Sequence, residues 1–376
     1  MDYLYLLEFV DKHNSLNGFT PATYSIFTYD NKDLVPIRIA VVGPGNRRFK
    51  ANPNDSIWQF AKRCAQCSDM ITHELKIHLT YTHFMTESII VGIYRILTPK
   101  KHFISLILEP HLDIILPLNN LGRINLIDDI KIIMGLDATS LLELVGIAYG
   151  EYNFVDRYIE NDLEKRGHLK DGKIIIQNYD YAKDAMLLWS LFRNFWKQIF
   201  AIEYKSANSF ENDSAVKSWI KYVQDVGCVR GFPDCKTKDD LIEAITMIEF
   251  VLVVQHSAVN YSQPFYYGYV ENASGAIYNW DKFDLNSSNK EMNYIDPKKR
   301  LVQRRLIQLL GTLTASQKSL INVLQTSPIY NTPKYAAARD ELVNGINDYG
   351  NIVALREKNG FKVLDPKGTL IGGIFA

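Results

Sequence analysis

Apolar residues recur at three- to four-residue intervals through most of the chain beyond residue 57, with charged residues on the opposite face. This period is that of amphipathic α-helices. Ahead of it, residues 1–57 are rich in turn formers that bracket short apolar runs such as Pro36 to Val42, which predicts strands and loops. The segments with helical spacing are Asp69 to Leu97, Tyr181 to Ala201, Ala215 to Val226, Lys238 to Asn260, Pro297 to Leu324 and Thr332 to Asn359.

The connections between these segments do not have the composition of flexible interdomain linkers. Those at Asn161 to Ile176 and Val270 to Ile295 are polar and rich in glycine and asparagine, without repeats or low complexity. We therefore expect an all-α, mainly helical fold with a single domain over residues 1–376. It would comprise a lead-in with short strands at 1–57 and a helical core at 58–376.

The charge balance argues against polyanionic partners. Lys plus Arg and Asp plus Glu each number 42, so no excess field gathers nucleic acid or anionic lipid. Apolar runs such as Ser88 to Leu97 and Ile245 to Val254 are about half as long as a membrane span, and the acidic first residues do not fit a secretory signal. Four cysteines are too few for a disulfide scaffold. These features predict a globular chain that starts near Met1, has no transmembrane segment and is cytoplasmic.

Cysteine spacing raises zinc as an alternative kind of site. Cys64 and Cys67 have the separation of zinc ligands, but they fall within a helical pattern. The spacing of Cys228 and Cys235 fits no common zinc finger. The cysteines therefore give zinc little support.

Histidines are concentrated between residues 73 and 83, where the sequence is His-Glu-Leu-Lys-Ile-His-Leu-Thr-Tyr-Thr-His. One interpretation is that a helix simply carries several half-buried histidines, each hydrogen-bonded to a carbonyl or to water. The other is that His78 and His83 share a metal. Residues five apart in a regular α-helix point about 140° away from each other, so this second interpretation requires a π-type turn, a feature frequent at functional sites.

A second pair has the spacing of an ordinary helix. His256 and Asn260 are four residues apart, which places them on one helical face. Imidazoles combined with an amide oxygen and a carboxylate would suit Fe(II) or Mn(II) better than a thiolate-preferring ion. Spacing alone leaves both interpretations of the histidines open.

Ordered motifs along the chain resemble those of lipoxygenases. The resemblance covers roughly residues 25–376, and chance agreement of so many ordered motifs is very improbable. The motifs are Leu34-Val-Pro-Ile-Arg-Ile39, Gly43-Pro-Gly45, Trp58-Gln-Phe-Ala-Lys62, the histidine run 73–83, Glu87, Arg95, Pro110-His111, Asn119, Gly122-Arg123, Asp184 to Trp189, Trp219, Gly231-Phe-Pro233 and Gln255-His-Ser-Ala-Val-Asn-Tyr-Ser-Gln263.

The resemblance implies a non-heme iron centre. It makes His78, His83 and His256 ligands and Asn260 a weaker one, and it adds the main-chain carboxylate of the last residue. That residue is usually isoleucine in the family, whereas this chain ends in Ala376. The carboxylate does not depend on the side chain, so Ala376 stays a candidate ligand. Iron is the expected metal, with manganese as the alternative.

The resemblance also implies a dioxygenase reaction. Ferric hydroxide would abstract hydrogen from a carbon between two double bonds of a polyunsaturated fatty acid or similar lipid, and O2 would add to give a hydroperoxide, without any catalytic side-chain acid or base. Glu87 and Gln263 are expected to support the ligands, although each can equally serve an unrelated contact. The expected wall of an apolar channel includes Phe84, Leu118, Leu121 and Gly122, each of which can equally be plain core or a packing glycine.

Two departures from the family pattern bear on the substrate. We expect the chain to lack the long helical N-terminal portion and the β-sandwich that often precede this core. The site should then be more open, unless a homo-oligomer, a partner subunit or residues 1–33 cover it. Asp113 stands where some members carry an arginine suited to a fatty-acid carboxylate. Two rival functions therefore stay open: an oxidase of a nonlipid or carrier-bound biosynthetic substrate, and a noncatalytic helical interaction protein.

Overall fold

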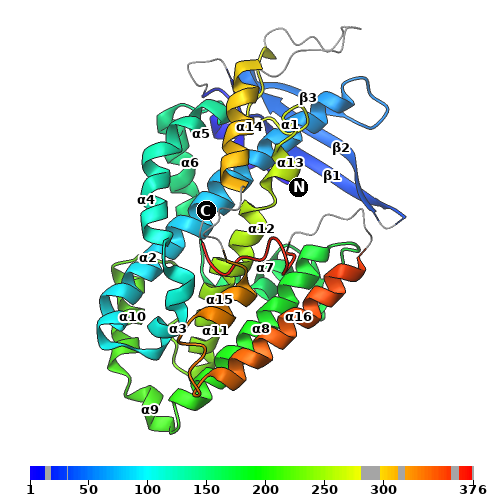
Figure 1. Cartoon of the computed structure of the whole chain (residues 1–376). Coiled ribbons are helices and arrows are strands. Elements are labelled where there is room, and N and C mark those ends of the chain that lie inside the picture. Colours follow the sequence, from blue (N-terminus) through cyan, green and yellow to red (C-terminus); the bar gives the residue numbers. More distant parts are fainter. Residues whose placement is uncertain (13–17, 32, 281–296, 312–317, 357–363, 375–376) are drawn as a thin grey trace. The chain divides into compact units, whose positions relative to one another are not determined.

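The structure, a computed structural model, describes residues 1–12, 18–31, 33–280, 297–311, 318–356 and 364–374 (Figure 1). The chain divides into two compact units, each assembled from three separate stretches of sequence. The first unit comprises Met1–Thr80, Asn120–Gly150 and Ser262–Thr312. The second comprises Tyr81–Asn119, Glu151–Tyr261 and Leu313–Ala376. The expected single domain stays a prediction, whereas the expected mainly helical fold with short N-terminal strands is confirmed.

The first unit pairs a small sheet with helices. Strands β1, β2 and β3 form an antiparallel sheet in that order, so the predicted strand at Pro36 to Val42 is confirmed within β2. Alternate residues of β2, Ile39 and Val41, are buried toward α1, and the Phe60 ring of α1 stacks on Phe49 at 5.8 Å. The elements are η1 (Leu4–Phe9), β1 (Ala22–Asp30), β2 (Asp33–Gly43), η2 (Pro44–Asn46), β3 (Arg47–Ala51), α1 (Trp58–Ile71), α5 (Ile127–Met134), α6 (Ala138–Glu151), α13 (Gln263–Tyr267) and α14 (Pro297–Gly311).

The second unit is built around the 24-residue helix α8, which packs against α11 and α16. Its aromatic side chains Phe192, Phe195 and Trp196 are buried there. Its Asp184 carboxylate forms an ion pair with the guanidinium of Arg356. The elements are η5 (Thr98–Lys100), α3 (Phe103–Leu112), η6 (Val155–Arg157), α7 (Ile159–Lys165), β4 (Leu169–Lys170), β5 (Lys173–Ile174), α8 (Asp180–Glu203), α9 (Ala207–Glu211), α10 (Ser214–Asp225), α11 (Lys238–Phe250), α15 (Leu320–Thr326) and α16 (Ala336–Leu355).

Two long helical stretches carry the predicted ligands. The first runs without a break from Trp58 to Leu97 through α1, η3 (Thr72–Phe84), α2 (Met85–Gly92) and η4 (Ile93–Leu97). The second runs from Lys238 to Asn260 through α11, η7 (Val251–Gln255) and α12 (His256–Asn260). Segments η3, η4 and η7 are π-helical.

The apolar part of the second stretch is longer than the sequence analysis allowed. By length and composition, Lys238–Tyr267 passes for a membrane span, but 89% of its most apolar window is buried within the protein. Core helices of globular proteins have the same properties.

The helical periodicity missed several elements. Helices α3, α4 (Ile115–Asn125), α5 and α6 were not singled out, because short or largely apolar helices such as Phe103–Leu112 show no clear polar face. The expected helix at Pro297 to Leu324 is described only as α14 and α15, since residues 312–317 lie outside the described range. The connection at Asn161 to Ile176 contains most of α7 and a two-stranded hairpin.

A glycine in the first long stretch permits a close helix crossing, which predicts opposite effects of alanine at two sites. A Cβ at Gly92 would lie 2.9 Å from a Tyr222 ring carbon and 3.2 Å from one of Trp219 on α10, whereas a Cβ at Gly146 of α6 has no neighbour within 4 Å. Gly92→Ala should therefore destabilise the fold by about 1–3 kcal/mol through overpacking. Gly146→Ala should stabilise it by roughly 0.5–1 kcal/mol through helix propensity. Urea unfolding measures both, and equal shifts would contradict the crossing.

Candidate metal centre

The winding of η3 decides how its two histidines are presented. His78 and His83 are five residues apart, and the segment from Thr72 to Phe84 is π-helical, as a shared metal requires. In a π-helix the backbone bonds link residues five apart, so side chains at that separation point in similar directions. The structure therefore removes the geometric objection that a regular α-helix would raise.

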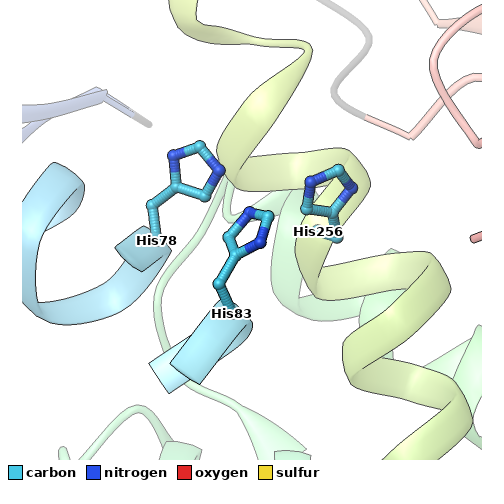
Figure 2. Close-up of side chains that lie close together, drawn as sticks. All are labelled: His78, His83 and His256. Atoms are coloured by element: carbon cyan, nitrogen blue, oxygen red, sulfur yellow. The ribbon is translucent and has the colours of Figure 1, made fainter. Parts of the chain in front are cut away.

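His256 completes the group. It begins α12, and its ring centroid lies 5.2 Å from that of His83. One ligand nitrogen from each of His78, His83 and His256 lies within 4.8 Å of the other two, and Figure 2 shows the three rings gathered from the two helical stretches. Within the described part of the chain, no other group of three such side chains has this geometry. Three imidazoles make a candidate metal site.

The His83 ring is held by Asn119. The Asn119 amide nitrogen donates to the Glu87 carboxylate at 2.8 Å, so the Asn119 oxygen faces His83 Nδ1 at 2.7 Å. Nδ1 therefore carries the proton, and Nε2 is the candidate ligand atom. Glu87 thus acts on His83 through Asn119.

The His78 ring is oriented from two sides. Its Nδ1 lies 3.1 Å from a Glu74 carboxylate oxygen and 3.1 Å from the Gln263 amide. Burial lowers the pKa of His78 to about 4 and raises that of Glu74 to about 7. The imidazole is therefore neutral at physiological pH, which is the form that binds metals.

The other two predicted ligands are Asn260, which the structure describes, and Ala376, which it does not. Asn260 is buried at the end of α12, four residues after His256 on the same helix. Ala376 lies outside the described residues. The segment before it is anchored near His256, because the Ile371 amide donates to the hydroxyl of Ser257 at 3.0 Å. Ligation by Asn260 and Ala376 stays a prediction.

A buried polar cluster holds the same C-terminal segment. His111 Nδ1 bonds the carbonyl oxygen of Gly372, and its Nε2 lies 2.8 Å from the Tyr330 hydroxyl and 3.8 Å from Glu249. Glu249 accepts from the indole of Trp196, and its second oxygen has no hydrogen-bond partner among the described residues. His111 thus satisfies a buried backbone carbonyl of the C-terminal segment.

The expected channel residues are not all enclosed. Phe84 and Leu118 are half-buried, whereas the Leu121 side chain is 57% exposed on α4. Gly122 is half-buried, and a Cβ there would meet only a Leu126 methyl at 3.8 Å. Their role in a channel stays a prediction.

The sequence analysis missed three supporting residues. Asn119 was noted only as a motif position, and Glu74 and Ser257 were not assigned a role. A signal existed for Glu74, which precedes His78 by four residues and so shares its helical face. The partners Asn119 and Ser257 depend on tertiary contacts. Cys64 and Cys67 are buried apolar residues of α1, and no described metal cluster includes them.

Comparisons with known proteins bear on this site. A family model described as Lipoxygenase matches residues 1–323. The manganese lipoxygenase of Pleurotus sapidus is 31% identical over 269 residues, which cover 69% of this chain and 40% of that protein. The linoleate 9/13-lipoxygenase of Pseudomonas aeruginosa is 27% identical over 267 residues, covering 68% of this chain and 38% of that protein. This chain thus spans about two fifths of the length of these relatives.

The fold is also similar to that of solved lipoxygenase structures. A fungal lipoxygenase from Fusarium graminearum superimposes with a TM-score of 0.85 and 26% identity, over 99% of this chain and 70% of that one. The described helices are therefore arranged as in a lipoxygenase catalytic region.

The bond between Asn119 and His83 predicts a loss of metal affinity on truncation. Asn119→Ala removes the acceptor that fixes the His83 tautomer, and such partners typically contribute about 10- to 100-fold in metal affinity. Competition with a chelator, followed by mass-spectrometric metal analysis, measures this change. Asn120→Ala changes the exposed neighbour on the same helix and should leave affinity unaltered. Equal affinities of both variants would contradict the role of Asn119.

The buried Glu249 and His111 predict a pH dependence of stability. Burial raises the pKa of Glu249 from 4.5 to about 8 and lowers that of His111 from 6.5 to about 4. Both groups are therefore neutral in the folded chain. Between pH 4.5 and 6.5 the unfolded pair binds the same number of protons as the folded pair. Above pH 6.5 it binds one fewer, so the free energy of unfolding falls until about pH 8.

Glu249→Gln should remove that fall, because glutamine cannot ionise. Urea unfolding at pH 6 and pH 8 tests it against Glu143→Gln, which alters an exposed carboxylate. A fall that persists in Glu249→Gln would show that other groups cause it.

Proposed function

Because this chain belongs to the lipoxygenase family, we propose that it is a non-heme metal dioxygenase that forms a hydroperoxide from a polyunsaturated fatty acid or a similar lipid. One observation carries the proposal: three imidazoles offer ligand atoms within 4.8 Å of one another, on helical stretches that belong to the matched family region. The relatives' names state lipoxygenase activity, one of them on linoleate. The site therefore supports oxygenation better than a purely structural role.

The donor set suits iron or manganese. Three neutral imidazoles with the Asn260 amide oxygen and the Ala376 carboxylate would form a mixed nitrogen and oxygen site of the kind these ions accept. We propose iron as the resident metal and manganese as the alternative, since one relative is named a manganese enzyme. When bound, the metal supplies the one-electron chemistry by which a carbon between two double bonds loses a hydrogen atom.

The residues of this chain have supporting roles in that reaction. Asn119 with Glu87 fixes His83, and Glu74 with Gln263 fixes His78, so the ligand nitrogens need no reorganisation when the metal binds. His111 and Ser257 tether the segment that leads to Ala376. Phe84, Leu118 and Leu121 would contribute apolar surface for the substrate.

The other expectations complete the proposal. We expect a homo-oligomer or a partner subunit to cover the site, and the protein to act in the cytoplasm on O2 and an apolar unsaturated substrate. The second candidate is oxidation of a nonlipid or carrier-bound substrate. The observation that favours it is Asp113, an exposed acid after α3 that would repel a fatty-acid carboxylate approaching it.

Removing one ligand tests the proposal. Wild-type protein is expected to contain about one iron or manganese per chain, to consume O2 with linoleate and to yield a hydroperoxide by mass spectrometry. His256→Gln should lose metal and activity together, whereas His168→Gln, which lies outside the cluster, should keep both. Metal-free wild-type protein that shows no oxygen uptake after iron loading would refute the enzyme assignment. Uptake with other unsaturated substrates but not with free fatty acids would favour the second candidate.

Gly122 predicts the stereochemistry of oxygenation. It aligns with the family position where glycine tends to accompany R products and alanine S products, and its surroundings accept a methyl group without a clash. Gly122→Ala should shift oxygenation toward the other end of the pentadiene and toward S configuration, because the methyl blocks O2 at one end. Chiral chromatography of both products measures the shift. An unchanged pattern with intact turnover would eliminate this role.

A further inference from the structure

The even charge balance of the whole chain hides a local concentration of cations on α14. Its 15 residues, PKKRLVQRRLIQLLG, include five cations and no acid. The sequence analysis found no field that would gather anionic lipid, neither from the whole chain nor from a long run of one charge, because uncharged residues separate Lys298-Lys-Arg300 from Arg304-Arg305. The helix lies entirely within the first unit, beside α13 (Figure 1).

The buried face of α14 is fixed by a glutamine. Gln303 is 2% exposed, and its amide nitrogen donates to the carbonyls of Ala273 at 2.7 Å and Tyr267 at 3.3 Å, while its oxygen accepts from Gly275 at 3.0 Å. Leu306 and Ile307 are buried beside it. These contacts set the rotation of the helix, so the opposite face is held outward.

That outward face combines charge with apolar side chains. At about 100° per residue, its exposed positions fall within an arc of roughly 140°. Leu301 is 72% exposed and Leu309 62% exposed, in contrast to leucines that pack into a core. The face comprises Lys298, Leu301, Arg304, Arg305, Gln308 and Leu309.

Aromatic side chains lie on the adjoining segment. Arg300 pairs with Glu271 at 3.0 Å, which places one edge of α14 beside the chain that carries Tyr269. Arg304 follows Arg300 by one turn along that edge. Phe265, Tyr266 and Tyr269 are 47% to 67% exposed, although most large aromatics of the described chain are buried. Exposed tyrosine and phenylalanine next to arginine and leucine are typical of residues at a membrane–water interface.

We propose that the exposed face of α14, together with Phe265, Tyr266 and Tyr269, is a docking surface for an anionic phospholipid bilayer. The cations meet the lipid phosphates and carboxylates, and the leucines and aromatic rings enter the headgroup layer. Charge complementarity favours a lipid surface over a second copy of this chain, because two copies of a face with several cations and no acid repel each other. The surface would hold the protein where unsaturated lipids are found, but its binding does not require the metal.

Vesicle sedimentation tests the electrostatic part. The wild type is expected to bind phosphatidylcholine vesicles that contain phosphatidylserine more tightly than phosphatidylcholine alone, and high salt should weaken this binding. Each cation near an anionic leaflet strengthens binding about fivefold, so Arg304→Gln/Arg305→Gln should weaken it by about thirtyfold. The control is Lys165→Gln/Lys183→Gln, which removes the same charge at exposed sites of α7 and α8 and should have little effect.

A second variant tests the apolar part. Leu301→Ser/Leu309→Ser should weaken binding to both kinds of vesicle without changing its salt dependence, and thermal unfolding should show an intact fold because both side chains are exposed. Three results would overturn the proposal: no preference for phosphatidylserine, equal weakening by the α14 and the control variants, or tighter binding to duplex oligonucleotide than to vesicles. Sedimentation velocity provides a fourth test. The proposal would also be overturned if the wild type were a dimer that Leu301→Ser/Leu309→Ser dissociates while vesicle binding stays unchanged.

Discussion

The five-residue separation of His78 and His83 conflicts with a regular α-helix, and the winding of η3 resolves the conflict. A helix with 3.6 residues per turn would point the two rings about 140° apart, so one of them would face away from any shared ligand. The π-helical winding of Thr72 to Phe84 brings positions five apart toward one direction. The helix continues unbroken on both sides, so the wider turns are held between regular segments that are anchored by their own buried faces.

Polar residues in a largely apolar interior then determine how the histidine rings are oriented and which ring nitrogen is protonated. An imidazole that loses water needs a hydrogen-bond partner, and each partner also selects which nitrogen carries the proton. Asn119 does this for His83, and the Glu74 carboxylate, which can only accept, does it for His78. The same rule explains the C-terminal segment, where His111 and Ser257 bond to its backbone. The candidate metal site and the tethered tail thus both depend on the general requirement to satisfy buried polar groups.

The surface charges matter for a different reason from the buried polar groups, because what counts is where they cluster. Equal numbers of acids and bases give no net field at a distance, but proximity decides what a surface binds because salt screens charges beyond about 10 Å. On α14 five cations are clustered within 15 residues that include no acid. A neutral protein can therefore present a strongly cationic helix face, and the exposed leucines on it distinguish that face from an ordinary solvated one.

The sequence by itself determined the elements and the residue types of the site. Apolar spacing predicted the long helices, because a 3.6-residue period is imposed locally by one buried face, and the His83 and His256 positions followed from ordered motifs. The interpretation in which His78 and His83 share a metal also predicted the π turn, which η3 confirms. The periodicity failed for helices α3 to α6, which are short or largely apolar.

Only the tertiary structure decided which ligand each supporting residue contacts. Asn119 lies 36 residues from His83, and Gln263 lies 185 residues from His78, so no local pattern links them. Glu249, seven residues before His256, reads in the sequence as one polar residue in an apolar helix, and its contact with Trp196 appears only after packing. The outward face of α14 was equally hidden, because the residue that fixes its rotation, Gln303, bonds to backbone groups about 30 residues away. Contacts between distant segments depend on how whole helices pack, and this information is not carried by any short stretch of the chain.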